Sequence, residues 1–250
     1  MGLRKMYEQF QPEGIGRDAF ISLGLQEGFR LRSIANPVRT TKSIKSNRYY
    51  NLLGGKRFTG VNQIWSSDIF YFPFNGAHHY VVLIMDVYSR RIIGYNIADN
   101  MRAENNVKAL QMALSLRGVS DYKKQLIHHS DRGSQYIAEL YTGLLDDYNI
   151  EISMCNDVLE NAHMERANGT IKNEYLNRWE IKSEKELSRR LNAACEGYNN
   201  RAHKSLSKKT PIEFELELKE TPENKRVVLE VFTVEKSTHN QNQITLFPGL

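Results

Sequence analysis

The sequence predicts an α/β fold, preceded by a basic N-terminal arm and followed by a C-terminal extension of helix and irregular structure. Between residues 64 and 154, short apolar runs rich in β-branched and aromatic residues alternate with segments of helical period. An apolar content of 40% in 250 residues is enough to bury one core of roughly 150 residues with appendages. Residues 1–60 hold eleven Lys or Arg against four acids, whereas the remainder holds 23 against 25. The net charge therefore changes from +7 to −2 along the chain.

The first two strands are expected at residues 64–72 and 79–87, joined by a turn at Asn75-Gly76. Asn-Gly is a preferred pair for the two-residue turns of β-hairpins, because both residues tolerate a positive φ. In the register that this turn favours, Asp86 lies opposite Trp65 and on the other sheet face from Asp68.

Asp86 is therefore interpreted as a structural residue. Its expected partner is one of the two arginines that follow it, Arg90 or Arg91.

The periodicity places the other elements in a regular order. Helical segments repeat apolar residues every three or four positions, and strands are shorter and alternate or run continuously apolar. The expected elements are a strand at 91–98, a helix at 102–116, a strand at 125–130, a helix at 136–148, a strand at 151–154, a helix containing Met164–Tyr175 and a helix at 185–198. Residues 16–28 also have helical spacing, and a further strand is expected at 226–235.

Three carboxylates stand in three different elements: Asp68 in WSSDIFYF, Asp131 in HHSDRGSQY and Glu165 in ENAHMERANGTIKNEY. Asp68 lies in a run that is typical of a strand covered on both faces, where an uncompensated carboxylate is costly. Mg²⁺ prefers oxygen ligands and keeps several waters, so a few carboxylates and a substrate phosphate can complete its shell. Two such ions roughly 3.5–4 Å apart stabilise both oxygens of an in-line displacement at phosphorus. The three acids therefore suit two-metal phosphoryl transfer.

The helix that carries Glu165 has two distinct lines of residues. One is an apolar stripe suited to docking on the sheet, comprising Met164, Ala167, Ile171 and Tyr175. The other is polar, comprising Asn161, Glu165, Asn168 and Lys172. This polar line is expected to face DNA, and the alternative is an ordinary solvated helix face.

Five segments follow, in order, the pattern of bacterial insertion-sequence transposases with a retroviral-integrase-type (DDE) catalytic core. The resemblance runs from about Gln63 to Phe214, and the combination is specific although each segment alone is weak. The segments are WSSDIFYF, YVVLIMDVYSRRIIGY, HHSDRGSQY, NAHMERANGTIKNEY and YNNRAHKSLSKKTPIEF.

The resemblance implies a ribonuclease-H-like mixed sheet flanked by helices, and catalysis of DNA strand cleavage and strand transfer by a mobile element. It implies two Mg²⁺ (or Mn²⁺) ions, with Asp68, Asp131 and Glu165 as catalytic metal ligands and Lys172 touching DNA beside the site. The implied partners are double-stranded DNA, as element ends and target, and further copies of the chain, with no membrane involved. Two rival functions remain: a ribonuclease-H-like nuclease without strand transfer, and a degenerate or domesticated DNA-binding protein.

The third ligand has a competitor. The interval from Asp131 to Glu165 is a little shorter than is usual in the family, and the family's Asp-Asn-Ala is here Glu160-Asn161-Ala162. Glu165 is preferred because the Asn-Ala-x-x-Glu spacing is kept and because Lys172 follows two helical turns later. Glu160 stays open as the alternative.

The basic arm has no acid between Gly28 and Ser67. Such a segment suits contact with DNA phosphates, and the alternative is a solvated linker. Its basic residues, interleaved with Tyr49 and Tyr50, are Arg30, Arg32, Arg39, Lys42, Lys45, Arg48, Lys56 and Arg57. The expected organisation is thus a DNA-binding segment at 1–60, a catalytic core at 61–180 and a C-terminal helix and tail at 181–250.

The remaining signals indicate a cytoplasmic protein, and the resemblance implies that it is bacterial and nucleoid-associated. The longest apolar run is too short to span a bilayer, and no signal-peptide core precedes the fold. Cys155 and Cys195 are expected to be free thiols. His128 and His129 are expected to be hydrogen-bonded strand residues and not metal ligands. Arg201 and His203 are open to two interpretations, a salt bridge at a helix end or contact with the DNA backbone.

Overall fold

The computed structural model describes residues 2–29, 49–119, 125–155 and 161–230. Contacts divide the chain into two compact units, residues 1–40 and residues 41–250. The second unit holds the sheet and the helices that pack on it, together with residues 49–60 and the described residues beyond 180. The expected DNA-binding residues from Arg30 to Arg48 lie outside the described part of the chain.

The N-terminal unit is a pair of helices, α1 (Leu3–Phe10) and α2 (Arg17–Gln26). The ring of Tyr7 packs against that of Phe20 at a centroid distance of 5.6 Å. The helices approach closely at Gly24, where a Cβ would lie 2.4 Å from a terminal methyl of Leu3 and would force that side chain to shift. The helix expected within residues 16–28 is therefore present, and α1 is an element that the sequence pattern did not predict.

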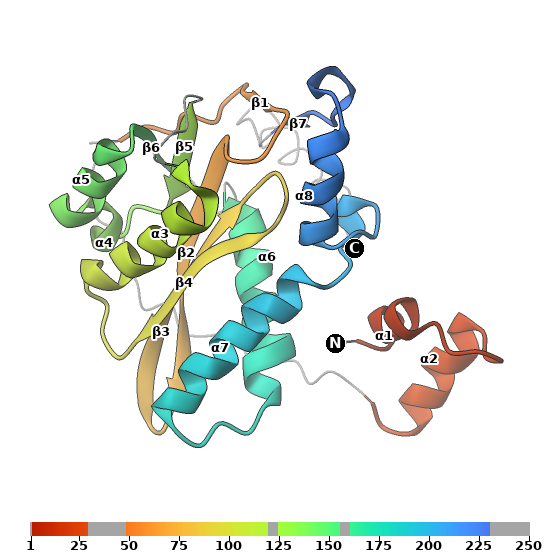
Figure 1. The fold of residues 1–250 in the computed structure, drawn as a ribbon. Coiled ribbons are helices and arrows are strands. Elements are labelled where there is room, and N and C mark those ends of the chain that lie inside the picture. Colours follow the sequence, from red (N-terminus) through yellow and green to blue (C-terminus); the bar gives the residue numbers. More distant parts are fainter. Residues whose placement is uncertain (1, 30–48, 120–124, 156–160, 231–250) are drawn as a thin grey trace, which may run out of the picture. The chain divides into compact units, whose positions relative to one another are not determined.

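The second unit is built on a five-stranded mixed sheet (Figure 1). The strand order is β4-β3-β2-β5-β6, with β2, β3 and β4 antiparallel and with β5 and β6 parallel to β2. The strands are β2 (Ile64–Phe74), β3 (Ala77–Asp86), β4 (Ile92–Ala98), β5 (Leu126–Ser130) and β6 (Ile150–Met154). The predicted α/β fold with a mixed sheet is confirmed.

The first hairpin has the turn and the register that the sequence predicted. Asn75 and Gly76 have φ values of 49° and 74°, the left-handed conformation that an Asn-Gly turn supplies. Trp65 pairs with Asp86, so Asp68 pairs with Leu83. Because side chains alternate along a strand, Asp68 and Asp86 belong to opposite faces of the sheet.

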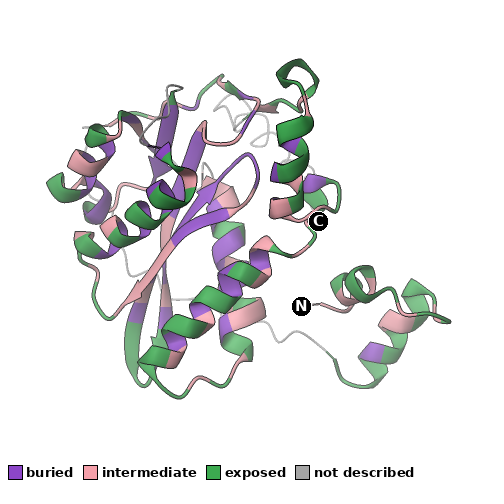
Figure 2. Cartoon of the chain, viewed as in Figure 1, coloured by how far each residue is buried: buried purple, intermediate pink, exposed green. Residues whose placement is uncertain are grey.

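Helices cover both faces of the sheet, and Figure 2 shows that the buried residues lie in the strands and on the helix sides that face them. On one face, α3 (Ala103–Arg117) and α5 (Glu139–Asp147) pack on Trp65, Val82 and Ile84. On the other face, α6 (Ala162–Thr170) and α7 (Glu184–Asn199) pack on Val81 and Leu83. A π-helical turn at Ile171–Tyr175 and a 3-10 turn at Leu176–Arg178 extend α6.

The helix expected at 136–148 is interrupted. It consists of α4 (Ser134–Ile137) and α5, separated by Ala138 in an extended conformation. Tyr136 and Tyr141 would lie on different sides of one continuous helix, but the break brings their rings to a centroid distance of 5.5 Å in the core. Tertiary packing of these two side chains outweighs the local helical pattern.

The chain beyond α7 adds α8 (Pro211–Glu220), which the sequence pattern did not predict. This helix begins with a capping box in which the Thr210 hydroxyl accepts from the Glu213 N–H and the Glu213 carboxylate accepts from the Thr210 N–H. Two short strands, β1 (Arg57–Phe58) and β7 (Leu229–Glu230), pair antiparallel. The strand expected at 226–235 is thus present at 229–230, and residues 231–235 lie outside the described chain.

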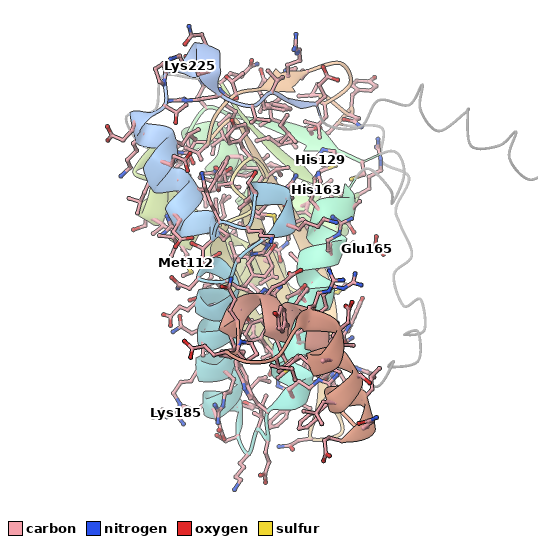
Figure 3. All side chains as sticks on the ribbon, turned by 90° about the vertical axis from the view of Figure 1, so that its right-hand side faces the viewer. Met112, His129, His163, Glu165, Lys185 and Lys225 are labelled. Atoms are coloured by element: carbon pink, nitrogen blue, oxygen red, sulfur yellow. The ribbon has the colours of Figure 1, made fainter. Side chains whose placement is uncertain are left out.

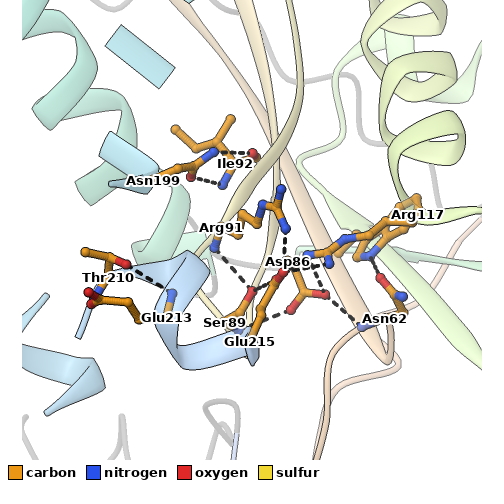
Figure 4. A network of polar contacts seen from close by, with 11 residues as sticks. Asn62, Asp86, Ser89, Arg91, Ile92, Arg117, Asn199, Thr210, Glu213 and Glu215 are labelled. Carbon is orange, nitrogen blue, oxygen red and sulfur yellow. Dashed lines mark hydrogen bonds and ion pairs between the residues drawn. The ribbon is translucent and has the colours of Figure 1, made fainter. Parts of the chain in front are cut away.

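Glu215 joins α8 to the sheet through a buried ionic network (Figure 4). It pairs with Arg117 at the end of α3 and with Arg91, and it accepts from the Ser89 hydroxyl. Asp86 is fully buried and pairs with Arg117 at 3.6 Å, while accepting from backbone N–H groups, including that of Asn62 at 2.7 Å. The expectation that Asp86 pairs with Arg90 or Arg91 was therefore wrong, because Arg117 reaches it from α3.

Candidate active site

Asp68 and Asp131 lie at the same edge of the sheet. β5 is parallel to β2, with Ser66 opposite His129, and Asp131 follows the last residue of β5 directly. Continuing this register two residues further sets Asp131 beside Asp68. The carboxyl ends of parallel strands meet at one edge, which is where α/β proteins hold their ligands.

Two hydrogen bonds hold the Asp68 carboxylate. Oδ1 accepts from the Ile69 N–H at 2.9 Å, and Oδ2 accepts from Asn168 Nδ2 at 2.7 Å. Burial, followed by the like charges of Asp131 and Glu165, nevertheless raises the pKa of Asp68 to about 7. The three acids are therefore near enough for their charges to act on one carboxyl group.

Asp131 is held by its own loop. Its Oδ1 accepts from the Gly133 N–H at 3.0 Å, and burial raises the pKa of its carboxyl group. A Cβ at position 133 would lie 3.0 Å from that same oxygen and 2.8 Å from Oε1 of Gln135. Glycine in the HHSDRGSQY segment therefore keeps the space that Asp131 occupies.

The polar line of α6 lies mostly against β2. Asn161 donates to the Ser67 carbonyl at 3.1 Å, Asn168 donates to Asp68, and Lys172 donates from Nζ to the Tyr71 carbonyl at 2.7 Å. These three side chains satisfy polar groups of the neighbouring strand, and the expectation that the line faces DNA stays a prediction. Glu165, in contrast, is exposed (Figure 3).

Lys172 is half-buried in this arrangement, and burial lowers its pKa. One of its three ammonium hydrogens is engaged with β2. The others can serve a phosphate without breaking the contact with β2.

Tyr136 is a site residue that sequence reasoning missed. Its hydroxyl is 2.8 Å from Ser67 Oγ, and Ser67 donates in turn to the Leu83 carbonyl at 3.0 Å. Burial, followed by the charge of Asp131, raises the pKa of the Tyr136 phenol well above its ordinary value. Its position five residues after Asp131 was the only signal in the sequence, and helix periodicity assigned it simply to the core.

The donor set fits a hard divalent cation. Asp68 and Asp131 present carboxylate oxygens whose charges oppose one another, and Oδ1 of Asn168 is buried without a hydrogen-bond partner among the described residues. A cation would offset the repulsion that raises the pKa of Asp68. Within the described ranges, however, no three His, Cys, Asp or Glu side chains are grouped closely enough to enclose an ion. Glu160, the competing third ligand, falls outside these ranges.

The histidines of β5 are hydrogen-bonded strand residues, as expected. His128 Nε2 is 2.8 Å from the Tyr141 hydroxyl, and His129 lies between Ser153 Oγ at 2.9 Å and Cys155 Sγ at 3.0 Å. Burial lowers the pKa of His128 to about 3 and that of His129 to about 4. Both are therefore neutral near pH 7. Cys155 is a free thiol, as is Cys195.

The YNNRAHKSL segment forms the end of α7, where Arg201 pairs with Glu174 at 2.6 Å. His203 Nε2 is 3.0 Å from the Tyr198 carbonyl. Of the two interpretations of Arg201, the salt bridge at a helix end is the one that these contacts support.

A five-stranded mixed sheet with helices on both faces, with two aspartates where β5 ends beside β2, defines the ribonuclease-H-like class of integrase catalytic cores. The integrase core domain of HTLV-2, solved in complex with magnesium in a dimeric form, shares this fold with a TM-score of 0.50 at 20% identity. The match covers 62% of this chain and 97% of that one. A simian T-cell lymphotropic virus intasome chain matches with a TM-score of 0.52 at 15% identity, over 93% of this chain and 79% of that one.

Sequence comparison identifies the particular family. Two models of the integrase core domain match, at residues 59–157 and 146–211. The chain is 32% identical to the uncharacterized 31 kDa protein of insertion element IS600 from Shigella sonnei, over 85% of this chain and 80% of that protein. It is 29% identical to the transposase for insertion sequence element IS629 from Shigella sonnei, over 80% of this chain and 68% of the relative. The chain belongs to the family of insertion-sequence transposases with an integrase core domain.

No described helix combines the length and the apolar content that crossing a bilayer requires.

Proposed function

We propose that this protein is a DDE-type transposase, a polynucleotidyl transferase that cleaves DNA at the ends of an insertion sequence and joins them to target DNA. The observation that carries this proposal is the meeting of Asp68 and Asp131 at one edge of an integrase-type sheet, with the pKa of Asp68 raised to about 7. A carboxyl group that is costly to ionise in the free protein is suited to a site that a cation completes.

The residues of the chain prepare this site. Asp68 and Asp131 would hold Mg²⁺ (or Mn²⁺), with Glu165 as the third ligand and Glu160 as its competitor. When bound, two ions would supply charge stabilisation to the attacking and leaving oxygens of an in-line displacement. Asn168 and the Ile69 N–H fix the orientation of Asp68, and the Gly133 N–H fixes that of Asp131. Held in these positions, the carboxylates need little rearrangement when the substrate arrives.

The proposed partners are two element ends and a target duplex. Joining two ends to one target requires coordinated sites, so we propose that the chain acts as a homo-oligomer on DNA. Lys172 is proposed to contact a phosphate beside the carboxylates, using the hydrogens that β2 leaves available. The basic residues Arg30, Arg32, Arg39, Lys42, Lys45 and Arg48 are proposed to track the backbone of the duplex.

A strand-transfer assay tests this function. Labelled duplexes with the element's own ends and a supercoiled target are incubated with Mg²⁺ and either the wild type or Asp131→Asn. Joined products are expected from the wild type, with a loss of at least about 10³-fold in the variant, because one ligand of the reacting centre is removed. Asp99→Asn is the matched control, since Asp99 is an exposed acid beyond β4.

The same assay separates the rival functions. Cleavage without joining in the wild type would identify a nuclease, and DNA binding with neither reaction would identify a degenerate DNA-binding protein. Glu165→Gln and Glu160→Gln, made separately, decide the third ligand. Activity that survives in Glu165→Gln and disappears in Glu160→Gln would move the assignment to Glu160.

A further inference from the structure

Arg90 occupies an unusual position in the turn between β3 and β4. Its φ is 62°, a left-handed conformation that residues other than glycine, asparagine and aspartate seldom adopt. Its Nη1 is buried and has no hydrogen-bond partner among the described residues. A buried guanidinium nitrogen without an acceptor is unfavourable, so both the backbone and the side chain at this position lack a structural explanation within the fold.

Arg91 also has a buried Nε without a hydrogen-bond partner among the described residues, but unlike Arg90 it forms an ion pair. Arg91, the next residue, pairs with Glu215 at 2.7 Å, and Arg201 pairs with Glu174 at 2.6 Å. Asp86, the acid whose charge acts on Arg90, is already engaged by Arg117 and by backbone N–H groups. Glu215, Glu174 and Asp86 are therefore engaged by other cations.

Arg166, on α6, is a second positive charge near Arg90. α6 packs on β2 and β3. The side of the helix that carries Asn161 and Asn168 forms hydrogen bonds with β2. In a helix of 3.6 residues per turn, positions 163 and 166 lie on the flank across the apolar stripe from position 165. The charge of Arg166 acts on Arg90, which places this flank near the β3–β4 turn. Burial is the largest cause that lowers the pKa of Arg90. Tyr198 opposes this shift, and the charge of Arg166 adds to it.

Among the described residues, neither arginine forms an ion pair with an acid. Arg166 is exposed and has no ion pair within the part of the chain that the structure describes. The guanidinium groups of Arg90 and Arg166, with Nη1 of Arg90 buried and unused among the described residues, make a site for an anion with several oxygens.

We propose that Arg90 and Arg166 bind a phosphodiester of the DNA backbone, on the flank of α6 opposite the carboxylates. This inference rests on the proposed function. An α-helix is about 10–12 Å across, and each strand of a duplex carries one phosphate per about 3.4 Å of duplex axis. A duplex whose reacting phosphate lies at Asp68 can therefore place another of its phosphates at Arg90. α6 would then contact the same DNA on both flanks, which fixes the duplex against rotation about the reacting phosphate.

The test is the salt dependence of DNA binding, measured by fluorescence anisotropy with the full chain. The background is Asp131→Asn without divalent metal, and the probe is a labelled duplex carrying the element's end. Arg90→Gln/Arg166→Gln should reduce the slope of log K against log salt by about 1, because one phosphate contact is lost. At about 0.1 M salt, affinity should fall by about 5- to 20-fold.

Three further variants make the result specific. Arg90→Lys keeps the charge and should keep the slope, and Arg189→Gln, at an exposed position of α7, should leave both slope and affinity unchanged. Arg90→Gly removes the unpaired guanidinium and the strained backbone, so it should melt at a higher temperature than its parent while losing affinity.

An unchanged slope of log K against log salt in the double variant would overturn the proposal. In Arg90→Gly, an unchanged slope together with a lower melting temperature would also overturn it, because Arg90 would then have a packing role. An altered oligomeric state at unchanged slope would also overturn it, since the occupant would then be a carboxylate of a second copy. Because no catalysis is measured, a failed strand-transfer assay would remove the proposed function without deciding this site.

Discussion

At the scale of single residues, Asp68 shows that a residue of the candidate site can lower the stability of the metal-free protein. Its pKa of about 7 arises from burial first and then from the charges of Asp131 and Glu165, which the hydrogen bonds from Ile69 and Asn168 only partly offset. A carboxyl group of this kind binds its proton more tightly in the folded protein than in the unfolded chain. Ionised Asp68 therefore lowers the free energy of unfolding in the metal-free protein.

The direction of the pKa shift of Asp68 gives the first prediction. Because the folded-state pKa lies above the unfolded value, the destabilisation is absent below about pH 4 and grows as pH rises towards 7. In EDTA at pH 8, Asp68→Asn should be more stable than the wild type by about 1–3 kcal/mol, and the difference should vanish near pH 4. Urea denaturation at both pH values measures this. A variant less stable than the wild type at pH 8 would contradict the assignment.

Asn168 gives the second prediction. Its side chain orients Asp68, and its own Oδ1 is buried without a partner among the described residues. Replacing an outer residue that orients a metal ligand typically weakens metal binding by about 10- to 100-fold. Asn168→Leu should therefore need about ten times more Mg²⁺ to reach half of the metal-induced rise in melting temperature. The exposed Asn173→Ala is the control, and an unchanged Mg²⁺ midpoint in Asn168→Leu would remove the positioning role.

At the scale of elements, the ionic network of Asp86, Arg117 and Glu215 attaches α8 to the sheet (Figure 4). Burial alone would raise the pKa of Glu215, but Arg117, Ser89 and Arg91 hold it below its ordinary value. Asp86 has a raised pKa, from burial first, although Arg117 opposes it. Arg117 therefore serves two carboxylates that the fold buries close together.

Removing that arginine is the third prediction. Arg117→Ala leaves two buried acids without their shared cation, and breaking a buried pair from one side costs about 3–5 kcal/mol. Urea denaturation should show this loss, whereas Arg189→Ala, on an exposed position of α7, should change stability by less than about 0.5 kcal/mol. A loss below about 1 kcal/mol in Arg117→Ala would mean that the network contributes little to the docking of α8.

Local sequence determined most elements but not their interruptions. The Asn75-Gly76 turn, the register of Trp65 with Asp86 and the strands at the centre of the sheet followed from turn chemistry and periodicity. The break at Ala138 did not, since it depends on where two tyrosines find space in the core. α8 has a clear signal in its Thr-Pro-x-Glu capping box, which the family pattern around it obscured.

At the scale of the whole molecule, the charge difference between the N-terminal segment and the remainder predicts that the segment contributes to DNA binding and that the sheet-containing unit folds without it. Deleting residues 1–48 should leave the melting temperature of the sheet-containing unit within a few degrees of its value in the full chain, because that unit has its own core. The same deletion should weaken DNA binding and reduce its salt dependence, because most of the excess positive charge is lost. Calorimetry and anisotropy measure the two effects, and an unchanged salt slope would remove the DNA-binding role of the arm.

The sequence by itself determined the fold class, the order of the five sheet strands along the chain and the first hairpin, and the acids of the candidate site stay its prediction. These features depend on period, turn chemistry and local motifs, which act over a few residues. Only the tertiary structure decided that Arg117 pairs with Asp86, that Asn161, Asn168 and Lys172 bind β2, and that Nη1 of Arg90 has no hydrogen-bond partner among the described residues. Those outcomes depend on which side chain, distant in the sequence, lies within hydrogen-bonding range of a buried group in the folded chain. Helical period names the face of a helix, but the strand packed beside that face determines what it contacts.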